Sequence, residues 1–103
     1  MNDILNRVDA VILSARRAAR QWGFPAIASI FMSQRQGHYD RLERIASQTA
    51  ESERDPGCRA LAQVIAEAAG AALLYQRSNS ASHAESALRR AACQMATAQR
   101  LLV

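Results

Sequence analysis

The sequence predicts an all-α fold, a small antiparallel up-and-down bundle of four helices. Apolar residues recur at alternating steps of three and four, which places them on one face of a helix. Proline, glycine and short polar runs interrupt this pattern at Gly23–Pro25, Asp55–Gly57 and Ser78–Ser80. Segments of about 20 residues joined by short turns favour such a bundle. A chain of 103 residues is one domain's length, so residues 1–103 are predicted to form a single domain.

The first helix is expected to run from about Asp3 to Trp22. Asn2 or Asp3 can cap its start, and Gly23 is well placed to end it. Its predicted inward face consists of Ile4, Val8, Val11, Ala15, Ala18 and Trp22.

The second helix is expected from Pro25 to about Arg54. Polar residues and Gly37 interrupt its centre, so two alternatives stay open. Either one long helix carries a polar layer that includes Arg35 and His38, or the helix breaks near Gly37. The predicted inward face consists of Ala28, Phe31, Arg35, His38, Leu42, Ile45 and Thr49.

The third and fourth helices have recognisable starting signals. Asp55 can cap the third helix, and Pro56 suits a first helical turn. The run Ser82–Glu85 has the sequence of a capping box, which predicts the start of the fourth helix. The third helix is predicted to bury Cys58, Leu61, Ile65, Ala68, Ala72 and Tyr75. The fourth is predicted to bury Ala84, Leu88, Ala91, Met95, Ala98 and Leu102.

The composition predicts a thin hydrophobic core. Half of the residues are hydrophobic, but alanine contributes heavily and aromatic residues make up only 5%. Because alanine buries little area, such a core gains little free energy at about 25 cal/mol per Å². A second chain is therefore expected to complete the core, which favours a homo-oligomer. The net charge of +4 comes with arginine as the only strong base, and it favours loose attraction to anions.

The residue types and spacings assign no catalytic, cofactor-binding or metal-binding residue. Glycine-rich phosphate loops, nucleophile elbows and paired inward carboxylates are missing from the sequence. His38 and His83 do not follow a glutamate by three residues, as a bundle metal site requires. Cys58 and Cys93 are expected to be buried free thiols. We therefore predict a protein that is not an enzyme.

The ends and the apolar runs of the chain predict its location. The N-terminus carries an acidic residue where a signal peptide has basic ones, and no apolar run approaches the ~20 residues that span a bilayer. A cytoplasmic protein without a membrane partner is expected.

Adjacent apolar residues predict an interaction surface. Pairs such as Val64–Ile65 and Leu73–Leu74 exceed what one inward stripe can bury, and an uncovered apolar patch marks an interface. We therefore predict a protein-binding module of the adaptor, small-chaperone or inhibitor type, with a protein as its partner. The expected contact residues are Phe24, Ile30, Phe31 and Leu74, rimmed by Arg16 and Arg20.

A second hypothesis is nucleic-acid binding through residues 26–42. This stretch has a small residue in a first helix, then a polar turn, then a second helix with polar side chains. It resembles a helix-turn-helix, which implies a DNA-binding protein whose second helix contacts base edges and phosphates. The residues expected to bind are Gln34, Arg35, His38 and Arg41.

Overall fold

The computed structural model describes residues 3–28 and 39–102. The predicted all-α four-helix bundle is confirmed. The second predicted helix is represented by a single turn, α2, and by a longer helix, α3; a break near Gly37 lies outside the described residues. The helices are α1 (Asp3–Gln21), α2 (Pro25–Ala28), α3 (Tyr39–Ser52), α4 (Pro56–Ser78) and α5 (Ala81–Leu101).

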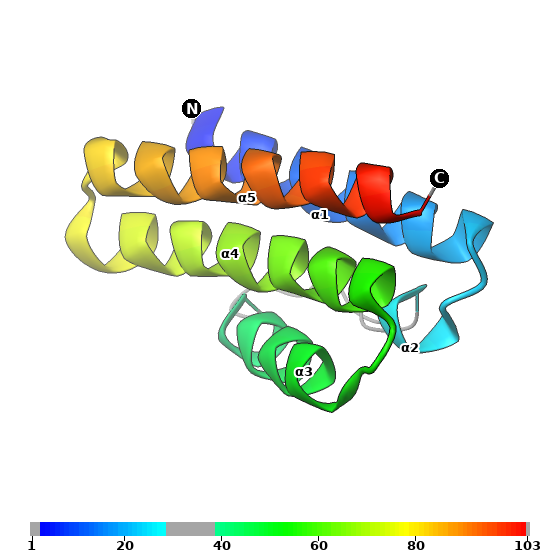
Figure 1. Cartoon of the computed structure of the whole chain (residues 1–103). Helices are drawn as coiled ribbons and strands as arrows, with labels where there is room; N and C mark the ends of the chain where they lie inside the picture. The colour runs from blue at the N-terminus through cyan, green and yellow to red at the C-terminus, as the bar shows by residue number, and fades with distance from the viewer. Residues whose placement is uncertain (1–2, 29–38, 103) are drawn as a thin grey trace.

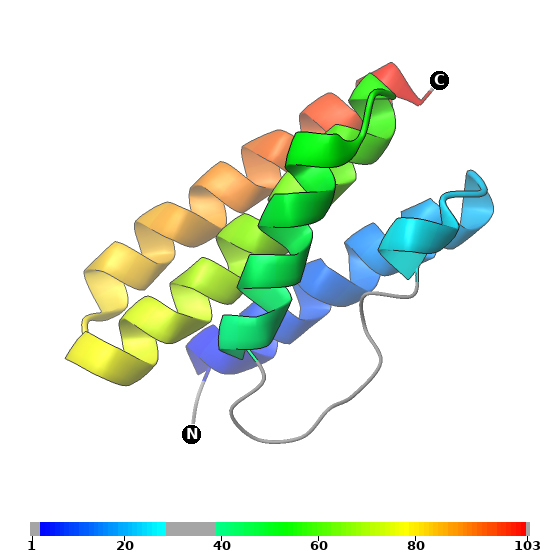
Figure 2. The same ribbon diagram turned by 90° about the horizontal axis from the view of Figure 1, so that it is seen from below.

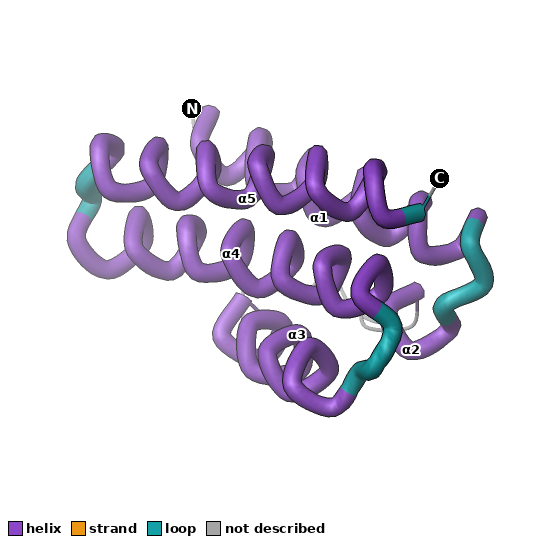
Figure 3. The backbone as a smooth tube through the Cα atoms, in the orientation of Figure 1, coloured by secondary structure: helices purple, strands orange, loops and turns teal. Residues whose placement is uncertain are grey.

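Helix α4 is the central element of the bundle. It packs against α1, α3 and α5, whereas α1 and α5 touch each other over a smaller region. Figures 1 and 2 show that α4 runs opposite to each of these three helices. The connections from α3 to α4 and from α4 to α5 are short loops (Figure 3). Direction therefore alternates from α3 to α5, while α1 runs in the same sense as α3.

The central position of α4 explains its composition. Val64 and Ile65 are both buried, although they are adjacent, because neighbouring helices cover α4 on several sides. Six of its alanines are buried as well, and their small side chains let those helices approach closely. The buried residues of α4 are Gly57, Cys58, Ala60, Leu61, Ala62, Val64, Ile65, Ala68, Ala69, Ala71 and Ala72.

Helix α4 also corrects the expectation that no segment is long and apolar enough for a membrane. Its 23 residues meet that criterion by length and composition, with a mean hydropathy of 1.3 over the best window. However, 61% of this window is buried inside the bundle. Contacts with other helices therefore account for the apolar composition.

The predicted inward faces of the first two helices are rotated relative to the observed ones. In α1, Ile12 is buried in place of the predicted Val11, which is half-buried; Trp22, which follows α1, is 47% exposed. In a straight α-helix, residues at strict alternating steps of three and four rotate by about 20° per seven residues away from one face. The residues that stay on the buried face are therefore separated more often by four positions than by three. Buried residues of α1 are Ile4, Val8, Ile12, Ala15 and Ala19. Those of α3 are Tyr39, Leu42, Ala46 and Ala50.

The same rotation corrects the predicted face of the second helix. Ile45 and Thr49 are only half-buried in α3, and the side chains of the first four predicted residues lie outside what the structure describes. The predictions for the later helices agree with the structure except at Tyr75 and Met95, which are half-buried.

The helix ends follow the predicted signals except at α5. Asp55 accepts a hydrogen bond from the Cys58 amide at 3.0 Å, and Gly23 has the positive φ of 76° expected after a helix. The predicted capping box is wrong, because α5 begins at Ala81 after Ser80. The Glu85 carboxylate is instead bound by the Arg7 guanidinium of α1, including a contact of 3.1 Å between Arg7 Nη2 and Glu85 Oε2.

Two polar contacts fix α1 relative to its neighbours. The Arg7 guanidinium lowers the pKa of Glu85 through its hydrogen bonds, so this pair links α1 to α5 in charged form. The Tyr39 hydroxyl donates to Asp9 Oδ1 at 2.7 Å, which links α3 to α1. Burial and the neighbouring Asp9 carboxylate raise the pKa of Tyr39, so the hydroxyl keeps its proton.

The two cysteines are predicted to differ in reactivity. Cys58 is buried as expected, but Cys93 is exposed, which corrects the prediction for that residue. Burial, followed by the nearby Glu53 carboxylate, raises the pKa of Cys58 to about 12 and suppresses its thiolate. A thiol-specific chromogenic reagent at mildly alkaline pH should therefore titrate one thiol in the folded protein and two after denaturation. Fast reaction of both thiols before denaturation would contradict this burial, and Cys93→Ser should remove the fast phase.

Candidate docking surface

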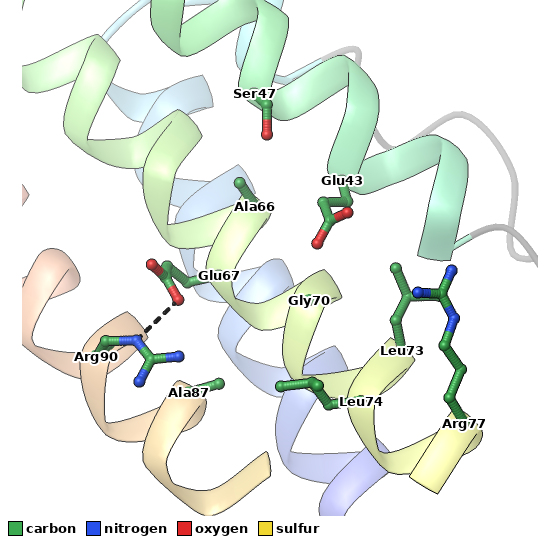
Figure 4. A pocket seen from close by; sticks show the side chains of 10 residues that line it. All are labelled: Glu43, Ser47, Ala66, Glu67, Gly70, Leu73, Leu74, Arg77, Ala87 and Arg90. Atoms are coloured by element: carbon green, nitrogen blue, oxygen red, sulfur yellow. Dashed lines mark hydrogen bonds and ion pairs between the residues drawn. The ribbon is translucent and has the colours of Figure 1, made fainter. Parts of the chain in front are cut away.

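An open groove runs over one face of α4, between α3 and α5. Its volume is about 360 Å³, and Figure 4 shows side chains from the three helices around it. The floor comes from α4, one wall from α3 and the other from α5. The lining residues are Glu43, Ser47, Ala66, Glu67, Gly70, Leu73, Leu74, Arg77, Ala87 and Arg90.

The floor of the groove is low because its central residues have little side chain. Ala66 is half-buried, and Gly70 has no Cβ. An ideal Cβ on Gly70 would lie 2.8 Å from Oε2 of Glu43, so the glycine lets this carboxylate lie against the α4 backbone. Figure 4 shows the Glu43 side chain extending from α3 toward α4. The groove therefore depends on a small residue at position 70.

The groove carries two positive and two negative side chains that differ in how they are paired. Arg90 of α5 donates from Nε to Glu67 Oε2 of α4 at 3.3 Å, and both side chains are partly exposed. Within the described part of the chain, the side chains of Glu43 and Arg77 make no hydrogen bond or ion pair. The groove thus offers one carboxylate and one guanidinium to an incoming molecule.

The apolar part of the groove lies near the C-terminal end of α4. Leu73 is half-buried, whereas Leu74 is 41% exposed and is one of few large apolar side chains with such exposure among the described residues. In Figure 4, Arg77 lies alongside Leu73. A groove that contains both an exposed leucine and an arginine without an ion-pair partner among the described residues is suited to a protein contact.

A second hollow of about 230 Å³ extends the groove along α4. It shares Ser47, Ala66 and Glu67 with the first hollow and adds Gln63 and Gln94. From position 63 to position 77, α4 rises about 21 Å at 1.5 Å per residue. The whole surface, which we call the α4 groove, is therefore long enough for several turns of another helix.

A different hollow of about 300 Å³ lies between α1 and α5. Its lining is uncharged and consists mainly of small side chains, with the half-buried Met95 as the largest. The Arg7–Glu85 ion pair joins the same two helices about one turn before the hollow on α1 and about two turns before it on α5. This hollow has no charged side chain in its lining, whereas the α4 groove has four that can pair with charges on a partner.

Clusters for a metal ion are absent from the described residues. No group of three or more histidine, cysteine, aspartate or glutamate side chains comes together within residues 3–28 and 39–102. His83 is exposed, and its Nδ1 lies 3.0 Å from the Ser80 hydroxyl.

The structure does not bring the described members of the predicted contact set into one patch. Leu74 lies in the α4 groove, whereas Arg20 is in the last turn of α1, at the opposite end of the molecule (Figure 1). Arg16 is half-buried, and Phe24 packs partly against the core. Ile30 and Phe31 lie outside the described residues. Among the described members of this set, Leu74 lines the groove.

The alternative nucleic-acid site falls mostly outside the described part of the chain. Gln34, Arg35 and His38 belong to the undescribed stretch. Arg41 is exposed near the start of α3, one residue after Asp40, which pairs with Arg44 at 3.3 Å.

The sequence contained a signal for the α4 groove that the prediction did not use. Gln63, Glu67, Gly70, Leu74 and Arg77 are spaced by four, three, four and three residues, the same repeat as the buried stripe. Such a repeat predicts a second seam on the same helix. Glu43 and Arg90 could not be placed beside it from spacing alone, because they come from other helices.

Comparisons with protein-family models, curated proteins and solved structures found no match to this chain.

Proposed function

We propose that the protein is a non-enzymatic protein-binding module, of the adaptor, small-chaperone or inhibitor type, and that it docks its partner in the α4 groove. The observation that supports this proposal is that one groove is lined by the exposed Leu74 and by Glu43 and Arg77, whose side chains have no ion-pair partner among the described residues. The groove is open along its length, as a docking surface for an extended helix has to be.

The chemistry of the groove indicates what the partner segment presents. Leu73 and Leu74 favour an apolar side chain, Glu43 favours a cation and Arg77 favours a carboxylate. An amphipathic helix with one apolar residue flanked by opposite charges meets these three requirements. The small residues on the floor let its backbone come close to α4.

Site-specific photo-crosslinking tests this proposal. A photoreactive residue at position 74 should form an adduct with one defined protein in cells that naturally produce the chain, and mass spectrometry would identify that protein. The same residue at position 13 is the matched control, because Leu13 is similarly exposed, at 38%, on α1. The position-74 adduct should disappear when Arg77→Glu is added, since the guanidinium is part of the proposed site.

Two results would contradict the proposal. One is the absence of any adduct from position 74, and the other is the same adduct from both positions. Nucleic acid would be the partner if the purified protein bound DNA with a steep loss of affinity as salt rises, because phosphate contacts release counterions. An apolar protein contact holds or tightens under the same change.

A further inference from the structure

The exposed face of α4 is complementary in shape and charge to the same face of a second, antiparallel copy. This inference rests on the proposed docking function and names the occupant of the α4 groove in the free protein. We propose that a second copy of this chain occupies the groove, with the two α4 helices antiparallel about a two-fold axis. Leu74 of each copy then lies over Gly70 of the other, and Arg77 of each lies opposite Glu67 of the other.

The register follows from the repeat along α4. Gln63, Gly70 and Arg77 are seven residues apart, and Glu67 and Leu74 fall between them. In an antiparallel helix pair, a residue of the set Gln63, Gly70 and Arg77 faces a residue of the set Glu67 and Leu74 on the other helix. When Gly70 faces Leu74 of the second copy, Arg77 necessarily faces Glu67 of that copy. One register thus satisfies the apolar and the charged positions together.

The shape of the groove suits this arrangement. Leu74 is exposed on the groove face of α4, and on the same face Gly70 leaves space that the end of the Glu43 side chain occupies. Leu74 and Gly70 are about one helical turn apart. A two-fold axis that passes between them therefore brings Leu74 of each copy onto Gly70 of the other. The small side chain of Ala66 keeps the floor open next to Gly70.

The charges are complementary across the same axis. Glu43 and Arg77 have no ion-pair partner within the described residues of one chain. Arg77 of the second copy arrives between the carboxylates of Glu67 and Glu43. Only the carboxylate end of the flexible Glu43 side chain contacts Gly70. This carboxylate can therefore rotate toward the Arg77 guanidinium of the second copy when Leu74 of that copy enters. The four groove charges of each copy sum to zero, so two grooves do not repel each other.

The first experiment is the mass of the purified protein by light scattering and sedimentation over a wide concentration range. We expect a monomer–dimer equilibrium that high salt does not abolish. Leu74→Glu should raise the dimer dissociation constant at least about tenfold, because it places a carboxylate in an apolar contact. Leu13→Glu is the matched control, with a similarly exposed leucine on α1, and it should leave the dissociation constant unchanged.

The register is tested by charge reversal. Glu67→Arg and Arg77→Glu should each be largely monomeric, since each places like charges opposite one another twice. An equal mixture of these two variants should form a heterodimer, because every opposed pair is then of opposite charge. Circular dichroism of each variant checks that the helices persist, since Glu67→Arg also removes the pair with Arg90.

Gly70→Ala tests the packing between the two copies without disturbing the fold of each copy. The new methyl group meets only the movable end of Glu43, so the melting temperature should not fall, while the dimer should weaken as the hole fills. A wild-type protein that stays monomeric at every concentration would overturn the proposal. A dimer that tolerates Leu74→Glu, or charge variants that do not restore each other, would overturn it as well.

The tests of the two proposals fail separately. Purified protein alone measures self-association, whereas in cells only a position-74 adduct with a different protein, and not one with a second copy, measures binding of a partner. A groove that binds another protein but never a second copy would contradict this inference and leave the docking function intact.

Discussion

Leu61→Ala should destabilise the protein by about 2–5 kcal/mol, one of the two largest effects expected for a single substitution. Leu61 is fully buried in α4, the helix that contacts α1, α3 and α5. Its removal leaves a cavity that the surrounding helices fill only partly, because a packed core relaxes incompletely around a missing side chain. Urea unfolding followed by circular dichroism measures the change, and the melting temperature should fall by about 10 °C or more.

Leu13→Ala is the control for this experiment. It removes the same atoms from a leucine that is 38% exposed on α1, so it should cost well under half as much. Equal losses for the two variants would show that Leu61 is not at the centre of the core. Both variants keep the α4 groove intact, so self-association does not confound the comparison.

Ala68→Leu should destabilise the bundle by about 1–3 kcal/mol through overpacking. Ala68 is fully buried in the stretch of α4 whose small side chains let neighbouring helices approach. Leucine and alanine are both good helix formers, so propensity changes little and the effect reports packing. The extra atoms have to push a neighbouring helix away from α4.

The matched control is Ala96→Leu, which makes the same change at an exposed position of α5. Its effect should stay within about 0.5 kcal/mol. Chemical denaturation measures the free energy of unfolding of both variants. Equal stability of Ala68→Leu and the wild type would contradict close packing around α4.

Local signals in the sequence predicted the helix ends well. Asp55 and Gly23 act as predicted, because a cap and a positive φ depend on a few adjacent residues. The capping box at Ser82–Glu85 failed because α5 begins at Ala81, so Ser82 lies inside the helix, and because Glu85 has a distant partner. Glu85 binds Arg7, and those residues are 78 positions apart, so no local pattern could show that the carboxylate was engaged elsewhere.

The candidate site was only partly accessible from the sequence. Leu74 was singled out by its apolar neighbour, and it lines the α4 groove, while its role in binding stays a prediction. Phe24, Arg16 and Arg20 were grouped with it, but the fold places the end of α1 far from the groove. Whether a helix face is covered depends on its neighbours, which periodicity along one helix does not specify.

The sequence by itself determined that the chain folds into helices, where most of them end, and that the bundle has a thin, alanine-rich core. These properties follow from spacing, capping residues and side-chain volume, all of which act over one or two turns. Only the tertiary structure decided that α4 is central, so that both Val64 and Ile65 are buried while Leu74 stays exposed. It also decided that Glu43, Gly70 and Arg90 meet in one groove, because contacts between helices depend on packing angles and on residues distant in sequence.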